Sequence, residues 1–373
     1  MIIKNVKVYQ DGFFTEAGIA FDETIREIGT LVDSDDAVDG QGAYLIPGLI
    51  DVHTHGRAGA DAADGDPEGV ITMSRSYLKD GVTSYCPTTV TLAMDEYETA
   101  VRALADYERP ADGAKIAGIH LEGPFLNPEK TGAQNPDNIV APEIGFYERM
   151  QEISGGKIRL ITVAPEMEGV LDLIAHVSRS CVVSLGHTAA DYETAMRAFD
   201  AGANHATHLF NAMPPLLHRA PGVIGAAYDA GADVELITDG IHSHPAIIRM
   251  AHALFREHLI LISDSIRCAG LPEGDYELGG LPVTLKNGRV TLKDSDTIAG
   301  SSIHLMEGLR TAVAAGVPLE EAVYAATYAP ARCLNMTDTI GVLAPGRAAD
   351  MVLLDADLNI IDIYIDGKRI GDQ

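Results

Sequence analysis

Histidine and acidic side chains recur in this sequence in positions that suit a metal ion. Several of them stand at or near the end of a short apolar run: His53, His55, Glu122, His187, His208 and Asp264. Imidazole and carboxylate groups without thiolates are the donors typical of Zn²⁺, Fe²⁺ or Mn²⁺ sites. A metal ion that keeps one position open to water would be catalytic, because it activates the water and polarises a carbonyl. These residue types therefore indicate hydrolysis of an amide or a related bond.

The apolar runs predict the scaffold that brings these side chains together. The middle of the chain has eight such runs, at residues 48–55, 83–90, 116–123, 159–165, 182–187, 205–210, 234–240 and 259–264. Longer amphipathic stretches, such as residues 68–81 and 191–202, separate most of them. This alternation predicts a (β/α)8 TIM barrel of the α/β class, whose active site lies at the carboxyl ends of its strands. A doubly wound sheet is less favoured, because no GxGxxG motif opens its first helix.

Taken singly, each histidine or acid could be structural, but six at equivalent strand ends favour one shared site. His120 lies on the same strand face as Glu122, and we expect it to support the ligands rather than bind the metal. His205 is three residues before His208, so a strand would turn it toward a helix. The remaining helical or junction histidines are expected to be structural: His176, His252 and His258.

Both ends of the chain predict β structure of a different kind. Residues 1–46 and 340–373 contain short strand-like runs and two Asp-Gly turns, at 11–12 and 366–367. We expect them to form one small β-sandwich domain, and residues 47–339 to form the metal-dependent catalytic barrel. An insertion at 270–298 is predicted to contain a hairpin with an Asn-Gly turn.

The overall charge limits the partners of the protein. The formal net charge is −27, from 27 basic and 54 acidic residues, which disfavours nucleic acid and anionic membranes. An anionic substrate would need a local cluster of cationic and N–H groups. Four widely spaced cysteines indicate reduced thiols, and no run resembles a signal peptide or a membrane helix. A cytoplasmic protein is therefore expected.

The sequence motifs resemble a known family over essentially the whole chain. The runs PGLIDVHTHG, HLEGPF, SLGHT, THLFNAM and SDS are similar to those of the amidohydrolase superfamily. More narrowly, HLEGPFLN, THLFNAMPP, TDGIHSHP and IAGSS resemble the N-acetylglucosamine-6-phosphate deacetylases. The resemblance implies hydrolysis of N-acetylglucosamine 6-phosphate to glucosamine 6-phosphate and acetate in amino-sugar catabolism. It also implies a homodimer with one or two divalent ions, Zn²⁺, Fe²⁺ or Mn²⁺, per subunit.

The resemblance also assigns roles to individual residues. Glu122, His187 and His208 match the main metal ligands, and Asp264 matches the catalytic acid/base. His53 and His55 would hold a second metal, with Glu122 bridging. The substrate-binding positions implied are Ala133, Asn211, Ala212, Arg219, Asp239, Gly240, Ile241, His242, Ile298, Ala299 and Gly300. Arg219 matches an arginine that reaches a phosphate, often across a dimer interface.

Two departures from the family pattern and three alternatives remain. Some members replace the first histidine of the HxH pair and hold a single metal, whereas His53 and His55 are both present here, so one or two metals stay open. Gln134 stands where some members carry a histidine near the substrate. Cyclic-amide hydrolases often bridge two metals with a carboxylated lysine on the fourth strand, but here Lys157 precedes that strand. A deacetylase for the galactosamine epimer differs by one hydroxyl of the substrate. A non-catalytic barrel relative should lack the ligands, which are all present.

Overall fold

The central part of the chain is a parallel barrel, as predicted. The computed structural model describes residues 1–30 and 37–371. The barrel strands are β6 (Leu49–Thr54), β9 (Val82–Thr89), β11 (Ile119–Glu122), β12 (Ile158–Val163), β13 (Val182–Leu185), β14 (His205–Ala206), β15 (Asp233–Ile237) and β16 (Leu259–Ile262). Each pairs in parallel with its neighbour in this order, and β10 (Lys115–Ile116) adds a short pairing beside β9. Every one of the eight predicted runs therefore contains a barrel strand.

The barrel closes between its first and last strands, just beyond their printed ends. The backbone N–H of Asp264 donates to His53 O at 3.0 Å, and that of His55 donates to Ser265 O at 2.8 Å. Ser263 Oγ also donates to the buried carboxylate of Asp51 at 2.5 Å. The closing seam thus carries three of the residues proposed for the metal site.

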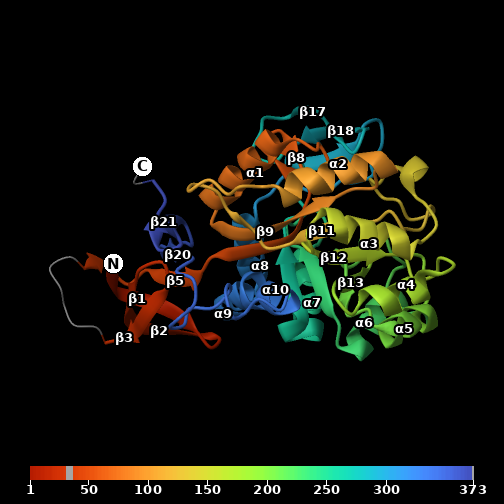
Figure 1. Ribbon diagram of the computed structural model, residues 1–373. Coiled ribbons are helices and arrows are strands. Elements are labelled where there is room, and N and C mark those ends of the chain that lie inside the picture. Colours follow the sequence, from red (N-terminus) through yellow and green to blue (C-terminus); the bar gives the residue numbers. More distant parts are fainter. Residues whose placement is uncertain (31–36, 372–373) are drawn as a thin grey trace.

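Helices cover the outside of the barrel (Figure 1). The amphipathic stretches at 68–81 and 191–202 form α1 (Pro67–Lys79) and α5 (Tyr192–Ala201). Further helices are α2 (Met94–Ala105), α4 (Val170–Val177), α8 (Leu305–Ala315), α9 (Leu319–Ala326) and α10 (Tyr328–Cys333). The structure adds α3 (Ile144–Ile153), α6 (Gly222–Ala230) and α7 (Pro245–Phe255), with short 3-10 turns at Pro136–Asn138 and Arg256–His258. Helix α1 shows the local rule: Asp66 accepts hydrogen bonds from the N–H groups of Glu68 and Gly69, and Pro67 begins the helix. No described helix is long and apolar enough to cross a membrane.

A separate β portion is built from both termini and lies to one side of the barrel (Figure 1). Its strands are β1 (Ile2–Gln10), β2 (Phe13–Phe21), β3 (Ile25–Gly29), β4 (Val38–Asp39), β5 (Tyr44–Pro47), β20 (Met351–Leu354), β21 (Ile360–Ile365) and β22 (Lys368–Arg369). The two Asp-Gly turns join β1 to β2 and β21 to β22, as predicted. Residues 31–36 and 372–373 of the predicted β domain lie outside the described residues, and the exact domain limits stay a prediction.

The insertion after the barrel forms a small antiparallel sheet above the mouth. Strands β17 (Gly274–Leu278), β18 (Leu281–Lys286) and β19 (Arg289–Leu292) pair in that order. The predicted Asn-Gly turn joins β18 and β19, and β17 is a third strand. A further ribbon of β7 (Gly56–Arg57) and β8 (Ala60–Asp61) follows β6. These loops rise from the carboxyl ends of the strands, where a barrel builds its site.

The opposite end of the barrel is apolar and tightly packed. Ile50, Cys86 and Ile260 point into one buried cluster that also contains Ala331 and Cys333 of the α10 region. All four cysteines are free and buried, as expected for reduced thiols. This floor supplies packing energy, which leaves the mouth free to hold polar groups.

The return from α10 toward the β portion gives a testable constraint. Gly341 has φ of 78°, and an added Cβ would lie 2.6 Å from Ala331 Cβ and 2.7 Å from Thr327 O. Gly346, with φ of 87°, has no atom within 4 Å of such a Cβ. We expect Gly346→Ala to cost about 1–2 kcal/mol from left-handed strain, and Gly341→Ala about 1–3 kcal/mol more from overpacking.

Urea unfolding of the two variants measures this difference through the midpoint at a constant slope. Equal losses in both proteins would show that the backbone strain, and not the contact beneath α10, limits this segment.

Candidate active site

The donor atoms of three predicted ligands lie close together at the barrel mouth. Glu122 ends β11, and His187 and His208 follow β13 and β14. Glu122 Oε1 lies 3.1 Å from the Nε2 atoms of both histidines, which are 3.1 Å apart. All three side chains are buried. Their donor atoms therefore surround one point, as a metal ion requires.

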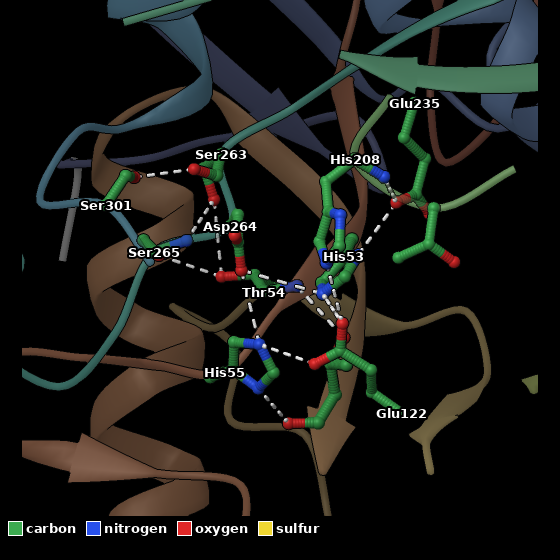
Figure 2. Close-up of polar contacts among 12 residues, drawn as sticks. His53, Thr54, His55, Glu122, His208, Glu235, Ser263, Asp264, Ser265 and Ser301 are labelled. Atoms are coloured by element: carbon green, nitrogen blue, oxygen red, sulfur yellow. Dashed lines mark hydrogen bonds and ion pairs between the residues drawn. The ribbon is translucent and has the colours of Figure 1, made fainter. Parts of the chain in front are cut away.

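A second group of side chains faces the other side of Glu122 (Figure 2). His55 Nε2 lies 3.3 Å from Glu122 Oε2 and 3.2 Å from Asp264 Oδ1. His53 Nε2 lies 3.5 Å from Glu122 Oε1 and 3.6 Å from Asp264 Oδ1. Glu122 thus stands between two sets of donors, the arrangement expected if it bridges two cations.

Unusual backbone conformations direct these side chains toward the mouth. His187, His208 and Asp264 have φ values of 47°, 26° and 49°, in the left-handed region that such residues seldom adopt. This strain is typical of functional sites, where surrounding contacts hold the backbone in place. For His208 the bend follows β14 directly and reverses the direction that strand alternation would give.

His205 corrects one expectation from the sequence. It lies inside the barrel and not against a helix: its Nδ1 is 2.9 Å from Ser184 Oγ and 3.9 Å from Glu235 Oε1. Thr207, two residues later, also points inward and contacts Ser184 Oγ. Side chains alternate between the two faces of the strand up to Thr207. The backbone bend at His208 then reverses the direction of its side chain, so both histidines point into the barrel.

The turn that carries His187 is held by a partly buried carboxylate, that of Glu166. Glu166 accepts hydrogen bonds from Asn127 Nδ2 at 2.7 Å, from Thr188 Oγ1 at 2.5 Å and from Ala189 N at 2.5 Å. The backbone N–H of Asn127 donates in turn to His187 O at 3.0 Å. These bonds fix the strained residue from both sides.

The hydrogen bonds of the histidines show that the site fits a cation. Nδ1–H of His187 donates to Lys130 O at 2.9 Å, and that of His55 donates to Thr88 O at 3.1 Å, since a carbonyl can only accept. In the neutral rings, the Nε2 lone pairs therefore face the oxygens of Glu122 and Asp264. Lone pairs facing one another repel unless a positive charge lies between them. A divalent metal ion supplies that charge.

The pKa shifts of the protein alone lead to the same conclusion. Burial by itself lowers the pKa of His55, but hydrogen bonds with Asp264 and Glu122 outweigh it and raise the pKa to about 10. Burial would raise the pKa of Glu122, yet the charges of His53 and His187 hold it well below its usual range. The carboxylates thus demand positive charge, which protons or metal ions can provide.

The site opens into a cavity of about 270 Å³. Its lining includes His55, Glu122, His187, His208 and Asp264. It also includes six of the residues predicted to bind substrate: Ala133, Asn211, Ala212, His242, Ile298 and Gly300. Leu278 from the β17–β19 sheet closes one side. Six of the eleven residues that the sequence assigned to substrate binding therefore line one cavity.

The other five predicted substrate residues do not line this cavity: Arg219, Asp239, Gly240, Ile241 and Ala299. Asp239 contacts the cavity residue His242 instead: its Oδ2 lies 2.7 Å from Nδ1 of His242 and orients that ring. Ala299 is fully buried, whereas Ile241 and Arg219 are exposed. Among the described residues, no lysine or arginine lines the cavity.

Gln134, which stands where some family members carry a histidine, has both ends of its amide engaged in the site. Its Nε2 donates to Glu122 Oε2 at 2.5 Å, and its Oε1 accepts from Thr91 N at 2.7 Å. The amide therefore steadies the central carboxylate. Thr91 was not singled out from the sequence, and a backbone contact of this kind leaves no sequence signal.

The structure also places the other polar residues that the sequence singled out. His120 lies beneath the site with Nε2 2.8 Å from Thr162 Oγ1, and it does not line the cavity. Outside the site, His176, His252 and His258 contact the carboxylates of Glu148, Glu321 and Asp233. Lys157 precedes β12, and its Nζ donates to Ala105 O, so it does not reach the metal site. This argues against the cyclic-amide hydrolases.

Sequence reasoning missed Glu235, although a signal was present. A carboxylate in the middle of the apolar strand run VELITDG has to face the barrel interior or a helix. Glu235 is fully buried, and its Oε2 lies 2.8 Å from His53 Nδ1. Burial raises the pKa of Glu235, but the charge of His53 outweighs it and lowers the pKa to about 2.

Comparison with known proteins agrees with this geometry. The sequence model of the amidohydrolase family matches residues 44–370, nearly the whole chain. The chain belongs to the amidohydrolase family. An N-acetylglucosamine-6-phosphate deacetylase of Bacillus subtilis (strain 168) is 38% identical over 86% of this chain and 82% of its own length. An N-acetylgalactosamine-6-phosphate deacetylase of Escherichia coli O157:H7 is 37% identical over 87% of both.

A solved structure confirms the fold. It is a mutant N-acetyl-D-glucosamine-6-phosphate deacetylase from Mycobacterium smegmatis in complex with N-acetyl-D-glucosamine-6-phosphate. It is 31% identical, covers 99% of each chain and superposes with a TM-score of 0.93. The predicted barrel and the β portion from both termini are thus confirmed.

The ligand geometry predicts how metal content responds to substitution. Glu122→Gln and His187→Ala should each lower the metal content, because each removes a donor from the converging group. His55→Ala should lower it from about two ions to one if both donor sets are filled. Elemental analysis of purified protein measures this, with the exposed His244→Ala as a control. Full metal content in Glu122→Gln and His187→Ala would contradict the assignment.

Proposed function

We propose that this protein deacetylates N-acetyl-D-glucosamine 6-phosphate, giving D-glucosamine 6-phosphate and acetate. The observation that carries the proposal is that Asp264 and the Glu122–His187–His208 group open into the same cavity of about 270 Å³. The relatives named for this activity support the choice of substrate. The reaction belongs to amino-sugar catabolism, and we place it in the cytoplasm.

The residues would hold one or two divalent ions, with Glu122, His187 and His208 as one set and His53, His55 and Asp264 around the other. Oxygen and imidazole donors suit Zn²⁺, Fe²⁺ or Mn²⁺. When bound, such an ion lowers the pKa of water and polarises the acetamide carbonyl. His187 and His55 are pre-oriented for this task, because their Nδ1–H groups are already bonded to backbone carbonyls.

Asp264 carries the proton transfers. Its carboxylate accepts a proton from the attacking water as the new C–O bond forms, and then donates it to the sugar nitrogen as the C–N bond breaks. The remaining proton of the water also passes to the amine, so acetate and the protonated amine leave and atoms and charge balance. Nearby His53 and His55 outweigh burial and lower the pKa of Asp264, which keeps it ionised as a base at neutral pH.

The phosphate needs cationic partners, and the described residues that line the cavity include no lysine or arginine. His242, oriented by Asp239, is one polar group there, and Asn211 is another. Arg219 lies exposed on the loop after β14. A guanidinium can grip a phosphate with two parallel hydrogen bonds. We therefore include in the proposal a homodimer in which the partner subunit's Arg219 reaches the phosphate.

The galacto epimer is the second candidate substrate. It is favoured by the relative from Escherichia coli O157:H7, whose identity to this chain is similar to that of the glucosamine enzymes. Acetate release from both 6-phosphorylated epimers and from the unphosphorylated sugars decides between them. A preference for the gluco 6-phosphate supports the proposal, and no release from any N-acetylated sugar would refute it.

Asp264→Asn tests the acid/base role. The side chain is nearly the same size but cannot take up a proton at neutral pH, so we expect kcat to fall by at least about 100-fold. KM and the metal in the Glu122 group should change little, because this substitution removes chiefly a transition-state function. Steady-state kinetics with metal analysis gives the answer. A near-normal kcat would show that another group moves the proton.

Arg219→Ala tests phosphate recognition. It should lower kcat/KM for the 6-phosphate substrate by roughly 2–4 kcal/mol, as when one partner of a buried charge pair is lost. Hydrolysis of unphosphorylated N-acetylglucosamine should scarcely change. Equal losses on both substrates would mean that Arg219 supports the fold.

Mixed dimers show which subunit supplies the arginine. In a dimer of one Arg219→Ala chain and one Asp264→Asn chain, contribution across the interface leaves one intact site. Contribution within a chain leaves none. Recovery of activity on mixing therefore separates the two arrangements.

A further inference from the structure

We propose that Glu235 is a positioning residue that makes His53 a ligand for the second metal ion and anchors the backbone of His208 at the first. The inference rests on the proposed metal-dependent function and deepens it. It assigns one buried carboxylate, outside the cavity, to both halves of the site.

A single oxygen of Glu235 makes both contacts. Glu235 lies in β15 inside the barrel and is fully buried. Its Oε2 accepts hydrogen bonds from His53 Nδ1 at 2.8 Å and from the backbone N–H of His208 at 3.0 Å. Figure 2 shows Glu235 on the far side of His53 and His208 from Glu122. The carboxylate therefore links a side chain of one donor set to the backbone of the other.

The bond to His53 fixes where its lone pair points. An ionised carboxylate can only accept, so Nδ1 carries the proton and Nε2 is left bare. Nε2 is buried and has no hydrogen-bond partner, and it is directed toward Glu122 and Asp264 at 3.5 and 3.6 Å. A carboxylate behind a metal-binding histidine fixes its orientation and raises its basicity. His55 and His187 have backbone carbonyls in this place, so only His53 of these three has a charged partner.

The bond to His208 holds a strained residue. His208 has φ of 26° and is buried at the bend that follows β14. Without Glu235, its backbone N–H would have no hydrogen-bond acceptor there. Glu235 satisfies this N–H and thereby supports the turn that aims the ring at Glu122. Both ligand sets thus depend on the position of one oxygen.

A merely structural carboxylate explains the geometry less well. Glu235 Oε1 is buried and has no hydrogen-bond partner, although burying half of an ionised group unpaired is costly. Nearby cations would compensate for this charge. Glu235, His53 and His120 lie close enough together to be considered as a further metal site. Both nitrogens of His120 already have neighbours, however, Thr162 Oγ1 at 2.8 Å and Val52 O at 3.3 Å, so this group is not suited to bind a metal.

The experiment measures metal binding rather than turnover. Full-length wild-type, Glu235→Gln and Glu235→Leu proteins are stripped of metal and titrated with Zn²⁺ or Mn²⁺, with stoichiometry and stepwise dissociation constants as readouts. Glutamine can keep its oxygen facing both donors but removes the charge, so we expect about 10–100-fold weaker binding of one of two ions. Leucine removes the acceptor of both hydrogen bonds, so we expect the second ion to be lost and the first to bind more weakly than in the wild type.

His205→Gln is the matched control. His205 is also buried inside the barrel and lies 3.9 Å from Glu235 Oε1, but it contacts no proposed ligand ring. The His205→Gln protein should bind two ions as the wild type does. A general disturbance of the barrel interior would instead weaken metal binding equally in His205→Gln and Glu235→Gln. In a double-mutant cycle, the losses from Glu235→Gln and His53→Asn should overlap rather than add.

Three results would overturn the inference: wild-type binding of only one ion, unchanged binding in Glu235→Gln, or an equal loss in His205→Gln. Because Glu235→Gln keeps the shape of the side chain, the test stands even if Glu235→Leu does not fold. A wild type that deacetylates and binds two ions while the Glu235 variants do likewise defeats this inference alone. A wild type that binds no metal defeats the proposed function.

Discussion

The site depends on one electrostatic constraint: acceptor atoms point at one another in a buried space. Lone pairs of His55 and His187 face the oxygens of Glu122 at 3.3 and 3.1 Å, because their Nδ1 atoms are already committed as donors to backbone carbonyls. Such a cluster is stable only with positive charge at its centre. The strained turns, the closing seam and the buried carboxylates around it all serve to hold this arrangement.

The barrel separates stability from chemistry along its axis. The floor near α10 is a close-packed apolar cluster, whereas the mouth holds the left-handed residues His187, His208 and Asp264. Parallel strands bring the side chains at their carboxyl ends to one rim, and the hydrogen bond from Asp264 N to His53 O ties the last strand to the first there. Packing at one end thus offsets the cost of strain at the other.

The net charge of −27 restricts how this protein can recognise a phosphorylated sugar. The net charge disfavours attraction of a dianion at long range, so binding depends on short, directional contacts. Within one subunit the described cavity lining offers His242 and Asn211 but no lysine or arginine. A cation supplied from a second subunit is the simplest way to complete such a site, and it would couple recognition to assembly.

The sequence by itself determined the strands, the two β ends and the main donors, because periodicity and residue type are local properties. It placed Glu122, His187, His208 and Asp264 at strand ends, and topology then made them neighbours. Only the tertiary structure decided which way His205 points, that Asp239 acts through His242, and that Glu235 lies behind His53. These outcomes depend on a backbone bend and on contacts between residues far apart in the chain. Local sequence patterns do not specify such contacts, even where, as for Glu235, they indicate that a carboxylate faces the interior.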